Sequence, residues 1–307
     1  MNKIILYGLG KRGKGIYEYL KCIGCEDIIY GFCDRRAKEI EEIWMGKKVY
    51  LPKEIEEDVK YCITLIDNDK RKEIQNIIGK ENCIEFGELA DLLNIDRVKF
   101  NRDFCAFYHI DNMNSYFEQA ENEQEIGMFW NFDTKFYDMF QKLDLSKVIE
   151  LACGHGRHVT HYLDRASEIT LVDILQENID FCRERLGENK KIKFYKNNGY
   201  DLEELNSDEY SALFTYDAMV HFEMMDIYQY LKDIYRVLKK GGRALFHHSN
   251  NTDDYKGSFF SSVHGRSFMN KEIFAYLAYR VGFIVLEQSV IDWAGVKGLD
   301  CLTLLEK

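Results

Sequence analysis

The chain has 307 residues, of which 46% are hydrophobic and 30% charged, which suits two α/β domains with buried cores. Its formal net charge of -11 makes it a poor partner for phosphate backbones, so we expect it to bind no nucleic acid. No apolar run approaches the roughly 20 residues of a membrane-spanning helix, and no signal peptide precedes the first predicted strand. We therefore expect a cytoplasmic protein without membrane association, with its nine scattered cysteines reduced and with no metal site.

Strands and helices alternate in the first third of the chain. The pattern predicts strands at 3–7, 27–33, 60–66 and 83–86 and helices at 15–21, 70–78 and 89–93. Such alternation is typical of parallel strands covered by helices. The block ends near residue 96, so it is about half the size of a full dinucleotide-binding domain.

A glycine cluster joins the first predicted strand to the first predicted helix. Gly8, Gly10 and Gly13 have the spacing Gly-x-Gly-x-x-Gly, and Asp34 ends the next strand 21 residues after Gly13. In the dinucleotide fingerprint such glycines let a diphosphate approach the helix N-terminus, and the acid accepts hydrogen bonds from a ribose. A ligand loop and a purely structural turn both remain open.

This first block resembles the small N-terminal domain of bacterial sugar acyltransferases and other half-Rossmann domains that bind nucleotide-sugars. The resemblance covers roughly residues 1–90 and rests on segments 7–10, 31–34 and 46–52. It implies that domain 1–96 holds a nucleotide or a nucleotide-sugar. An NAD(P)-binding module is an alternative, although the short block makes a working nicotinamide oxidoreductase the weaker interpretation.

The rest of the chain predicts a second and longer α/β block. Residues 97–146 are rich in aromatic side chains and are expected to be mostly helical, with 97–124 as a connector ahead of a domain at 125–307. Strands are expected at 147–151, 168–173, 192–196, 210–216, 242–248, 283–290 and 300–306, and helices at 156–166, 175–186, 226–238 and 271–281. Because no helix separates the last two strands, we expect a parallel sheet with an antiparallel addition.

Polar markers end three consecutive strands of this second block. Glu150 and the glycines Gly154 and Gly156 end the first, Asp173 ends the second, and Asn198 follows the third. The carboxyl ends of parallel strands lie at one edge of a sheet, where α/β proteins bind ligands. The glycines can bring backbone N–H groups to a carboxylate, Asp173 can accept hydrogen bonds from ribose hydroxyls, and the amide of Asn198 can pair with an adenine edge.

The second block resembles the class I S-adenosylmethionine (SAM)-dependent methyltransferases over about residues 125–305. The marks are 150–157, Asp173, Asn198-Gly199 and the turn 237–242; Ala152 replaces the usual first glycine of the loop. The resemblance implies a seven-stranded Rossmann-like sheet with SAM as cofactor, following the smaller half-Rossmann domain. It assigns cofactor binding to Glu150, Ala152, Cys153, Gly154, Gly156, Arg157, Asp173, Ile174, Asn198, Gly199 and Tyr216.

Histidines near the same edge are candidates for proton transfer. Methyl transfer to an alcohol needs a base or a metal, and an imidazole titrates near neutral pH. His221 follows the fourth strand of the block and is the expected general base, with His248 at the end of the next strand as a weaker candidate. His247 and His248 should point to opposite faces of the sheet. The histidines at 155, 158 and 161 are expected to belong to the cofactor loop and the surface rather than to a metal site.

The resulting hypothesis is a SAM-dependent O-methyltransferase for a sugar, a nucleotide-sugar or a related small molecule, with the N-terminal domain holding or docking the acceptor. The alternatives are a SAM-binding sensor or scaffold without catalysis, and a methyltransferase fused to an NAD(P)-binding module. A small-molecule or glycan acceptor is the expected partner, and a homodimer is left open.

Overall fold

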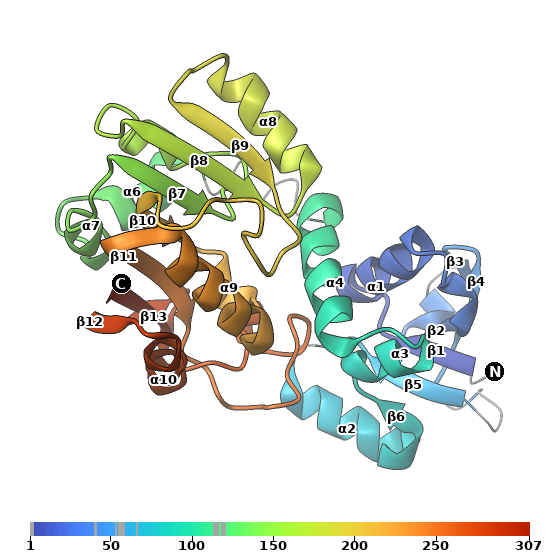
Figure 1. Cartoon of the computed structure of the whole chain (residues 1–307). Helices are drawn as coiled ribbons and strands as arrows, with labels where there is room; N and C mark the ends of the chain where they lie inside the picture. Colours follow the sequence, from blue (N-terminus) through green and yellow to red (C-terminus); the bar gives the residue numbers. More distant parts are fainter. Residues whose placement is uncertain are drawn as a thin grey trace. The chain divides into compact units, whose positions relative to one another are not determined.

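The computed structural model describes residues 3–39, 42–52, 54, 59–65, 67–112, 117 and 121–307 (Figure 1). The chain forms two compact units, the first made of residues 1–113 and 256–265 and the second of residues 114–255 and 266–307. These boundaries differ from the predicted 1–96, 97–124 and 125–307. Helix α4 (Arg97–Asn112) is part of the first core rather than a connector, because Phe100 and Phe104 on its inner face are fully buried there.

The segment 256–265 was expected in the second domain but completes the core of the first unit. Phe260 is buried among residues of that core, with its ring centroid 4.5 Å from that of Phe104. A segment that the sequence shows as a polar loop therefore contributes an aromatic residue, Phe260, to the first core.

The first unit is built on a six-stranded sheet of order β3-β4-β2-β1-β5-β6, in which only the β3–β4 pair is antiparallel. Its strands are β1 (Lys3–Tyr7), β2 (Ile29–Cys33), β3 (Ile43–Trp44), β4 (Lys47–Tyr50), β5 (Val59–Ile63) and β6 (Cys83–Ile84). Its other helices are α1 (Lys11–Cys22), α2 (Asn68–Ile78) and α3 (Phe86–Leu92). The α/β alternation is confirmed, whereas β3 and β4 were not predicted because both are short.

The second unit contains the predicted seven strands, in the order β12-β13-β11-β10-β7-β8-β9. They are β7 (Lys147–Leu151), β8 (Glu168–Asp173), β9 (Ile192–Lys196), β10 (Tyr210–Thr215), β11 (Leu238–Ser249), β12 (Ile284–Trp293) and β13 (Val296–Glu306). Strands β7 to β11 pair in parallel, and β13 joins both β11 and β12 in antiparallel fashion. The predicted antiparallel addition is thus confirmed.

Helices cover both faces of this sheet and bury two separate apolar clusters. One cluster includes residues of α6 (Glu123–Trp130), α7 (Lys135–Phe140) and α8 (Gln176–Leu186), and the other residues of α9 (Met224–Val237) and α10 (Lys271–Val281). Along β11, Leu245 faces the first cluster and Phe246 the second, as the alternation of a strand requires.

One predicted helix of the second unit is absent. Residues 156–166 form turns around a single 3₁₀ turn, η4 (Val159–His161), instead of an α-helix. The apolar spacing alone suggested a helix, but the backbone enters this segment from left-handed residues at Gly154 and Gly156.

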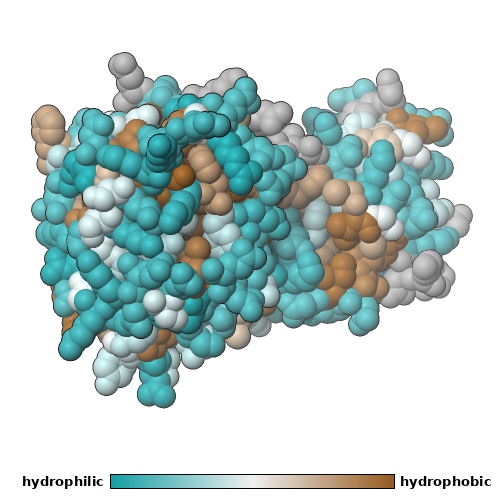
Figure 2. Space-filling view, turned by 45° about the horizontal axis from the view of Figure 1, so that its top comes forward, coloured by the Kyte–Doolittle hydropathy of each residue, from teal (hydrophilic) through white to brown (hydrophobic). Residues whose placement is uncertain are grey.

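The described part of the chain includes no helix long and apolar enough to cross a bilayer. Figure 2 shows a face that is mostly hydrophilic, with hydrophobic residues gathered in limited patches. This agrees with the high content of charged residues.

Candidate active site

The topology of the second unit creates one position suited to a ligand. Strand β7 lies between β8 and β10, so the chain proceeds from β7 to one side and then crosses to the other. At such a switch point the loops after two adjacent parallel strands diverge and leave a crevice at their carboxyl ends. The glycine loop after β7 and the segment after β10 are these two loops.

The glycine loop passes through three left-handed residues, with φ of +57° at Ala152, +53° at Gly154 and +69° at Gly156. A Cβ at Gly154 would lie 2.9 Å from the Phe117 ring, and a Cβ at Gly156 would lie 3.1 Å from Cys182 Sγ. Both glycines are therefore favoured by their left-handed conformation, and a Cβ at either position would also require its neighbour to shift. Ala152, the departure from the methyltransferase pattern, keeps the left-handed turn in spite of its Cβ.

Asp173 holds this loop in place. Its Oδ2 accepts a hydrogen bond from Gly154 N at 2.9 Å, while Oδ1 accepts from Leu175 N and from the Asn178 amide. The side chain is only 4% exposed. The structure thus brings together two predicted site residues, and the expected contact of Asp173 with a ribose stays a prediction.

Glu150 lies buried beneath the loop. Its Oε2 accepts a hydrogen bond from the Tyr162 hydroxyl at 2.6 Å, and Oε1 has no hydrogen-bond partner among the described residues. Burial raises the pKa of Glu150 to about 8, although the Tyr162 hydroxyl and the charge of Arg157 oppose the shift. An ammonium group beside Oε1 would satisfy this carboxylate, so the site fits the α-amino group of SAM.

The other predicted cofactor residues occupy different environments. Cys153 is buried, and the neighbouring Cys182 thiol together with burial raises its pKa, so it packs as a thiol while its backbone forms the loop. Ile174 is partly buried beside Asp173, and Gly199 is buried in the turn after β9, where φ is +87°. Tyr216 is buried at the end of β10.

Asn198 is exposed at the end of β9, and its amide is engaged within its own turn. Its Nδ2 donates to Asp201 at 2.8 Å, and its Oδ1 accepts from the backbone N–H groups of Tyr200 and Asp201. The neighbouring Asn197 is buried and donates to the Tyr230 hydroxyl. Recognition of adenine by Asn198 stays a prediction and would have to displace or share these bonds.

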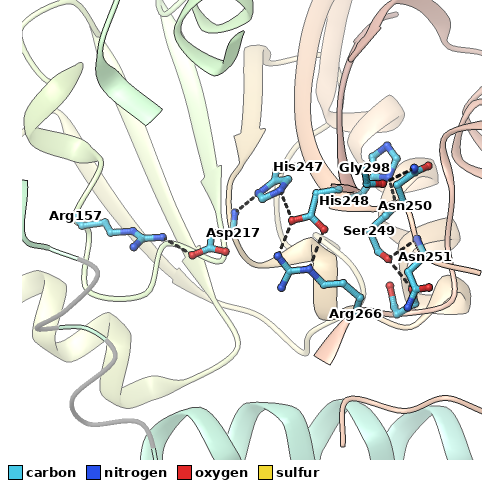
Figure 3. A network of polar contacts seen from close by, with 11 residues as sticks. Arg157, Asp217, His247, His248, Ser249, Asn250, Asn251, Arg266 and Gly298 are labelled. Atoms are coloured by element: carbon cyan, nitrogen blue, oxygen red, sulfur yellow. Dashed lines mark hydrogen bonds and ion pairs between the residues drawn. The ribbon is translucent and has the colours of Figure 1, made fainter. Parts of the chain in front are cut away.

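A buried polar network crosses the carboxyl ends of three strands (Figure 3). Arg157, which follows Gly156, donates to Asp217 at 3.1 Å, and the Asp217 backbone N–H donates to His247 Nδ1 at 3.1 Å. His247 Nε2 lies 3.0 Å from Asp300 Oδ2, and Arg266 donates to both oxygens of Asp300.

Of these residues only Arg157 was predicted from the sequence as a site residue. One signal was present, since Asp217 is the second residue after β10, much as Asp173 ends β8. The pairing of His247 with Asp300, 53 positions apart, had no local signal.

The two proposed catalytic histidines differ sharply in accessibility. His248 is fully buried, stacks on Phe274 of α10 and bonds through both nitrogens, to Ser249 O and Thr303 Oγ1. Burial lowers the pKa of His248 to about 3, so it stays neutral as a core residue and lacks access to an acceptor. His248 packs on the α9–α10 side of the sheet against Phe274, and its expected catalytic role stays a prediction. His221, in the 3₁₀ turn η5 (Met219–His221) after β10, is partly exposed.

The three histidines after β7 have separate packing roles. The His155 ring is stacked between Phe117 and Phe181, with centroid distances of 3.6 and 3.8 Å. His158 is buried and accepts a hydrogen bond from Trp130 Nε1, so the expectation that it lies at the surface was wrong. Within the described ranges, no group of three or more His, Cys, Asp or Glu side chains is arranged to hold a metal ion.

The other glycine loop lies in the first unit, and adding a Cβ would have a different consequence at each of its three glycines. Gly8 has φ of +115°, and a Cβ at Gly13 would lie 2.2 Å from Gly8 O, so Gly13 allows α1 to pack against the loop. A Cβ at Gly10 would meet nothing within 4 Å. Asp34 accepts hydrogen bonds from Leu9 N and from Arg36, and these bonds lower its pKa against the opposing effect of burial.

Known proteins are similar to parts of the chain. Among solved structures, the chain is similar to SAM-dependent methyltransferases from Aquifex aeolicus (11% identity, TM-score 0.47, covering 62% of this chain and 96% of that one) and Mesorhizobium loti (12%, 0.46, 56% and 97%). The Bacillus subtilis (strain 168) protein named "Putative methyltransferase YqeM" is 22% identical over 101 residues, 33% of this chain. The chain spans 41% of that relative's length.

A sequence family described as a methyltransferase domain matches residues 148–242. The match begins in β7 and ends in β11, so it includes the glycine loop, Asp173 and the segment after β10. The prediction of a methyltransferase domain is thereby confirmed for this part of the chain.

Proposed function

We propose that this chain transfers a methyl group from SAM to a hydroxyl of a small molecule, with sugars and nucleotide-linked sugars as the acceptor class. The observation that carries the proposal is the loop after β7, shaped by Gly154 and Gly156 and fixed by Asp173, within the region that matches a methyltransferase domain. When bound, SAM would supply a methyl group carried on a positively charged sulfonium. The acceptor oxygen attacks the methyl carbon in line with the C–S bond, and S-adenosylhomocysteine is the leaving group.

The residues of the glycine loop provide the cofactor contacts in this proposal. The N–H groups of the loop receive the carboxylate of SAM, and Glu150 Oε1 receives its ammonium group. Support comes from the buried position of that oxygen without a described partner. Asp173 keeps the loop in its left-handed conformation and is adjacent to the expected ribose position.

His221 is the proposed general base. Its turn follows β10 at the switch point, and the bond from Ser267 N to Val220 O fixes this turn. An imidazole that is partly exposed can reach an acceptor and take up the hydroxyl proton. The two histidines of β11 lack this access, since both are fully buried.

Two measurements test the proposal. The full chain should bind S-adenosylhomocysteine in calorimetry and should release this product from SAM with at least one member of a panel of sugars and nucleotide-sugars. His221→Ala should reduce turnover by about 100-fold or more while retaining affinity for S-adenosylhomocysteine. Full turnover in His221→Ala would reject the base role, and binding without turnover on any acceptor would favour the sensor alternative.

We also propose that the first unit binds a nucleotide or nucleotide-sugar at Gly8, Gly10 and Gly13. The support is that Gly8 has a positive φ, Gly13 lets α1 approach the loop, and a Cβ at Gly10, before the start of α1, would meet nothing within 4 Å. The first unit includes residues 256–265, so the test requires the full chain.

Substitution at Gly10 provides the test of this loop. Gly10→Ala adds a Cβ that contacts nothing in the protein but would obstruct a diphosphate, so it should abolish calorimetric binding of UDP-glucose or NAD⁺. Gly87→Ala, in α3, is the control, because its Cβ would lie 3.9 Å from its nearest neighbour. Equal binding by Gly10→Ala and the wild type would reject the loop as a ligand site, and binding of NAD⁺ alone would favour the NAD(P) alternative.

A further inference from the structure

The buried network beside the glycine loop is costly to maintain. His247 and Asp300 are fully buried, and Arg266 is 3% exposed. Removing a charge from water carries a large free-energy cost that pairing with another charge only offsets, so such groups are weak contributors to stability. Their concentration at the carboxyl edge of the sheet points to a role in the site rather than in folding alone.

The contacts of His247 define one tautomer. The Asp217 backbone N–H donates to Nδ1, so the ring carries its proton on Nε2 and donates it to Asp300. Arg266 grips the same carboxylate through Nε at 2.8 Å and Nη2 at 2.5 Å. These bonds and the hydrogen bond from His247 keep the pKa of Asp300 below its usual range, although burial acts in the opposite direction. The imidazole is therefore fixed in both orientation and tautomer.

The backbone of Asp217, whose N–H donates to His247, has an unusual conformation. Asp217 has φ of +56°, a left-handed conformation that residues other than glycine seldom adopt. In this conformation its N–H points to His247 while its carboxylate meets Arg157, whose side chain is 9% exposed. Arg157 directly follows Gly156, so the Asp217 conformation links β11 and β13 to the glycine loop after β7 (Figure 3).

We infer that His247 is a positioning residue for the cofactor loop, acting through the Asp217 backbone and the Asp217–Arg157 ion pair. The imidazole, oriented by Asp300 and Arg266, keeps Asp217 left-handed, and Asp217 then anchors Arg157 and the end of the loop. His247 itself touches no substrate in this scheme. The inference rests on the proposed function, since it assigns a role in binding SAM at the same site.

The two ring nitrogens can be tested separately. The carboxamide of His247→Asn extends as far as Nδ1, so its oxygen can still accept from the Asp217 N–H. The carboxamide of His247→Gln extends as far as Nε2, so it can still donate to Asp300 but offers no acceptor at the Nδ1 position. Thr303→Val is the matched control, because it removes the buried hydrogen bond to His248 Nε2. His248 lies on the opposite face of β11 from His247, so the substitution leaves the contacts of His247 intact.

Calorimetric binding of S-adenosylhomocysteine to the full chain distinguishes the possibilities. We expect His247→Gln to weaken affinity about tenfold, equivalent to about 1.4 kcal/mol, and His247→Asn to weaken it clearly less. Asp217→Asn should weaken it as His247→Gln does, because it removes the charge that Arg157 meets. Thr303→Val should lower the melting temperature without changing affinity.

The outcomes separate this inference from the proposed function. Failure of the wild type to bind S-adenosylhomocysteine would reject the proposed function. Wild-type binding together with equal affinities for His247→Asn and His247→Gln, or a loss in Thr303→Val as large as in His247→Gln, would overturn the positioning role alone.

Discussion

The burial of Glu150 predicts that the stability of the second unit depends on pH. Its carboxyl has a pKa of about 8 in the folded chain, compared with 4.5 for an ordinary glutamate. Since the folded state binds this proton more tightly, its contribution to stability is fully present below pH 4.5 and is lost as pH rises through 8. Between pH 5.5 and 7.5 the slope is about 1.36 kcal/mol per pH unit, a loss of roughly 2–3 kcal/mol.

Glu150→Gln isolates this contribution, because the amide retains an acceptor for the Tyr162 hydroxyl and does not titrate. Urea unfolding of both proteins at several pH values gives the difference in unfolding free energy. A Trp44→Phe background removes the tryptophan of the first unit, so that fluorescence reports Trp130 and Trp293 of the second. Parallel pH dependences for the two proteins from pH 5.5 to 7.5 would refute the reasoning.

Two further substitutions probe the loop and the division into units. Ala152→Gly should stabilise the chain by up to about 1 kcal/mol in urea unfolding, because relief of the left-handed conformation outweighs the added chain entropy. The control Ala278→Gly, in α10, should instead destabilise the chain by about 1 kcal/mol. If both substitutions lowered the unfolding free energy equally, the prediction for Ala152 would be contradicted. Phe260→Ala should cost about 3–5 kcal/mol and be reported by Trp44, whereas Phe132→Ala, 89% exposed, should cost little. A loss reported by Trp130 and Trp293 but not by Trp44 would contradict the assignment of Phe260 to the first core.

Local sequence patterns were sufficient for most strands of the second unit. Strands β7, β8 and β9 have the predicted bounds, since each is a short segment rich in apolar residues. The pattern failed at 156–166, where the spacing of apolar residues was helical but the left-handed residues before it directed the chain into turns. It also failed for β3 and β4, which are too short to show an alternation.

The residues of the candidate site likewise divide into those that local sequence predicts and those that it does not. Residues on one loop or at a strand end, such as Gly154 and Asp173, were identifiable because their chemistry follows from local position, and the structure joins them by a hydrogen bond. His248 could not be separated from His247 without knowing which face of β11 each helix covers. Both are fully buried, but His248 stacks on Phe274 of α10, whereas His247 lies beside Tyr216 and Trp293.

The sequence by itself therefore determined the α/β class, the two glycine loops and the resemblance to methyltransferases, because glycines, strand ends and apolar runs act within a few residues of one another. Only the tertiary structure decided that 256–265 belongs to the first unit, that α4 is part of its core, and that Asp217, His247 and Asp300 meet. The reason is that pairing among buried polar groups depends on which strands become neighbours. In the sheet, β11 lies between β10 and β13, so distant positions in the chain become adjacent partners.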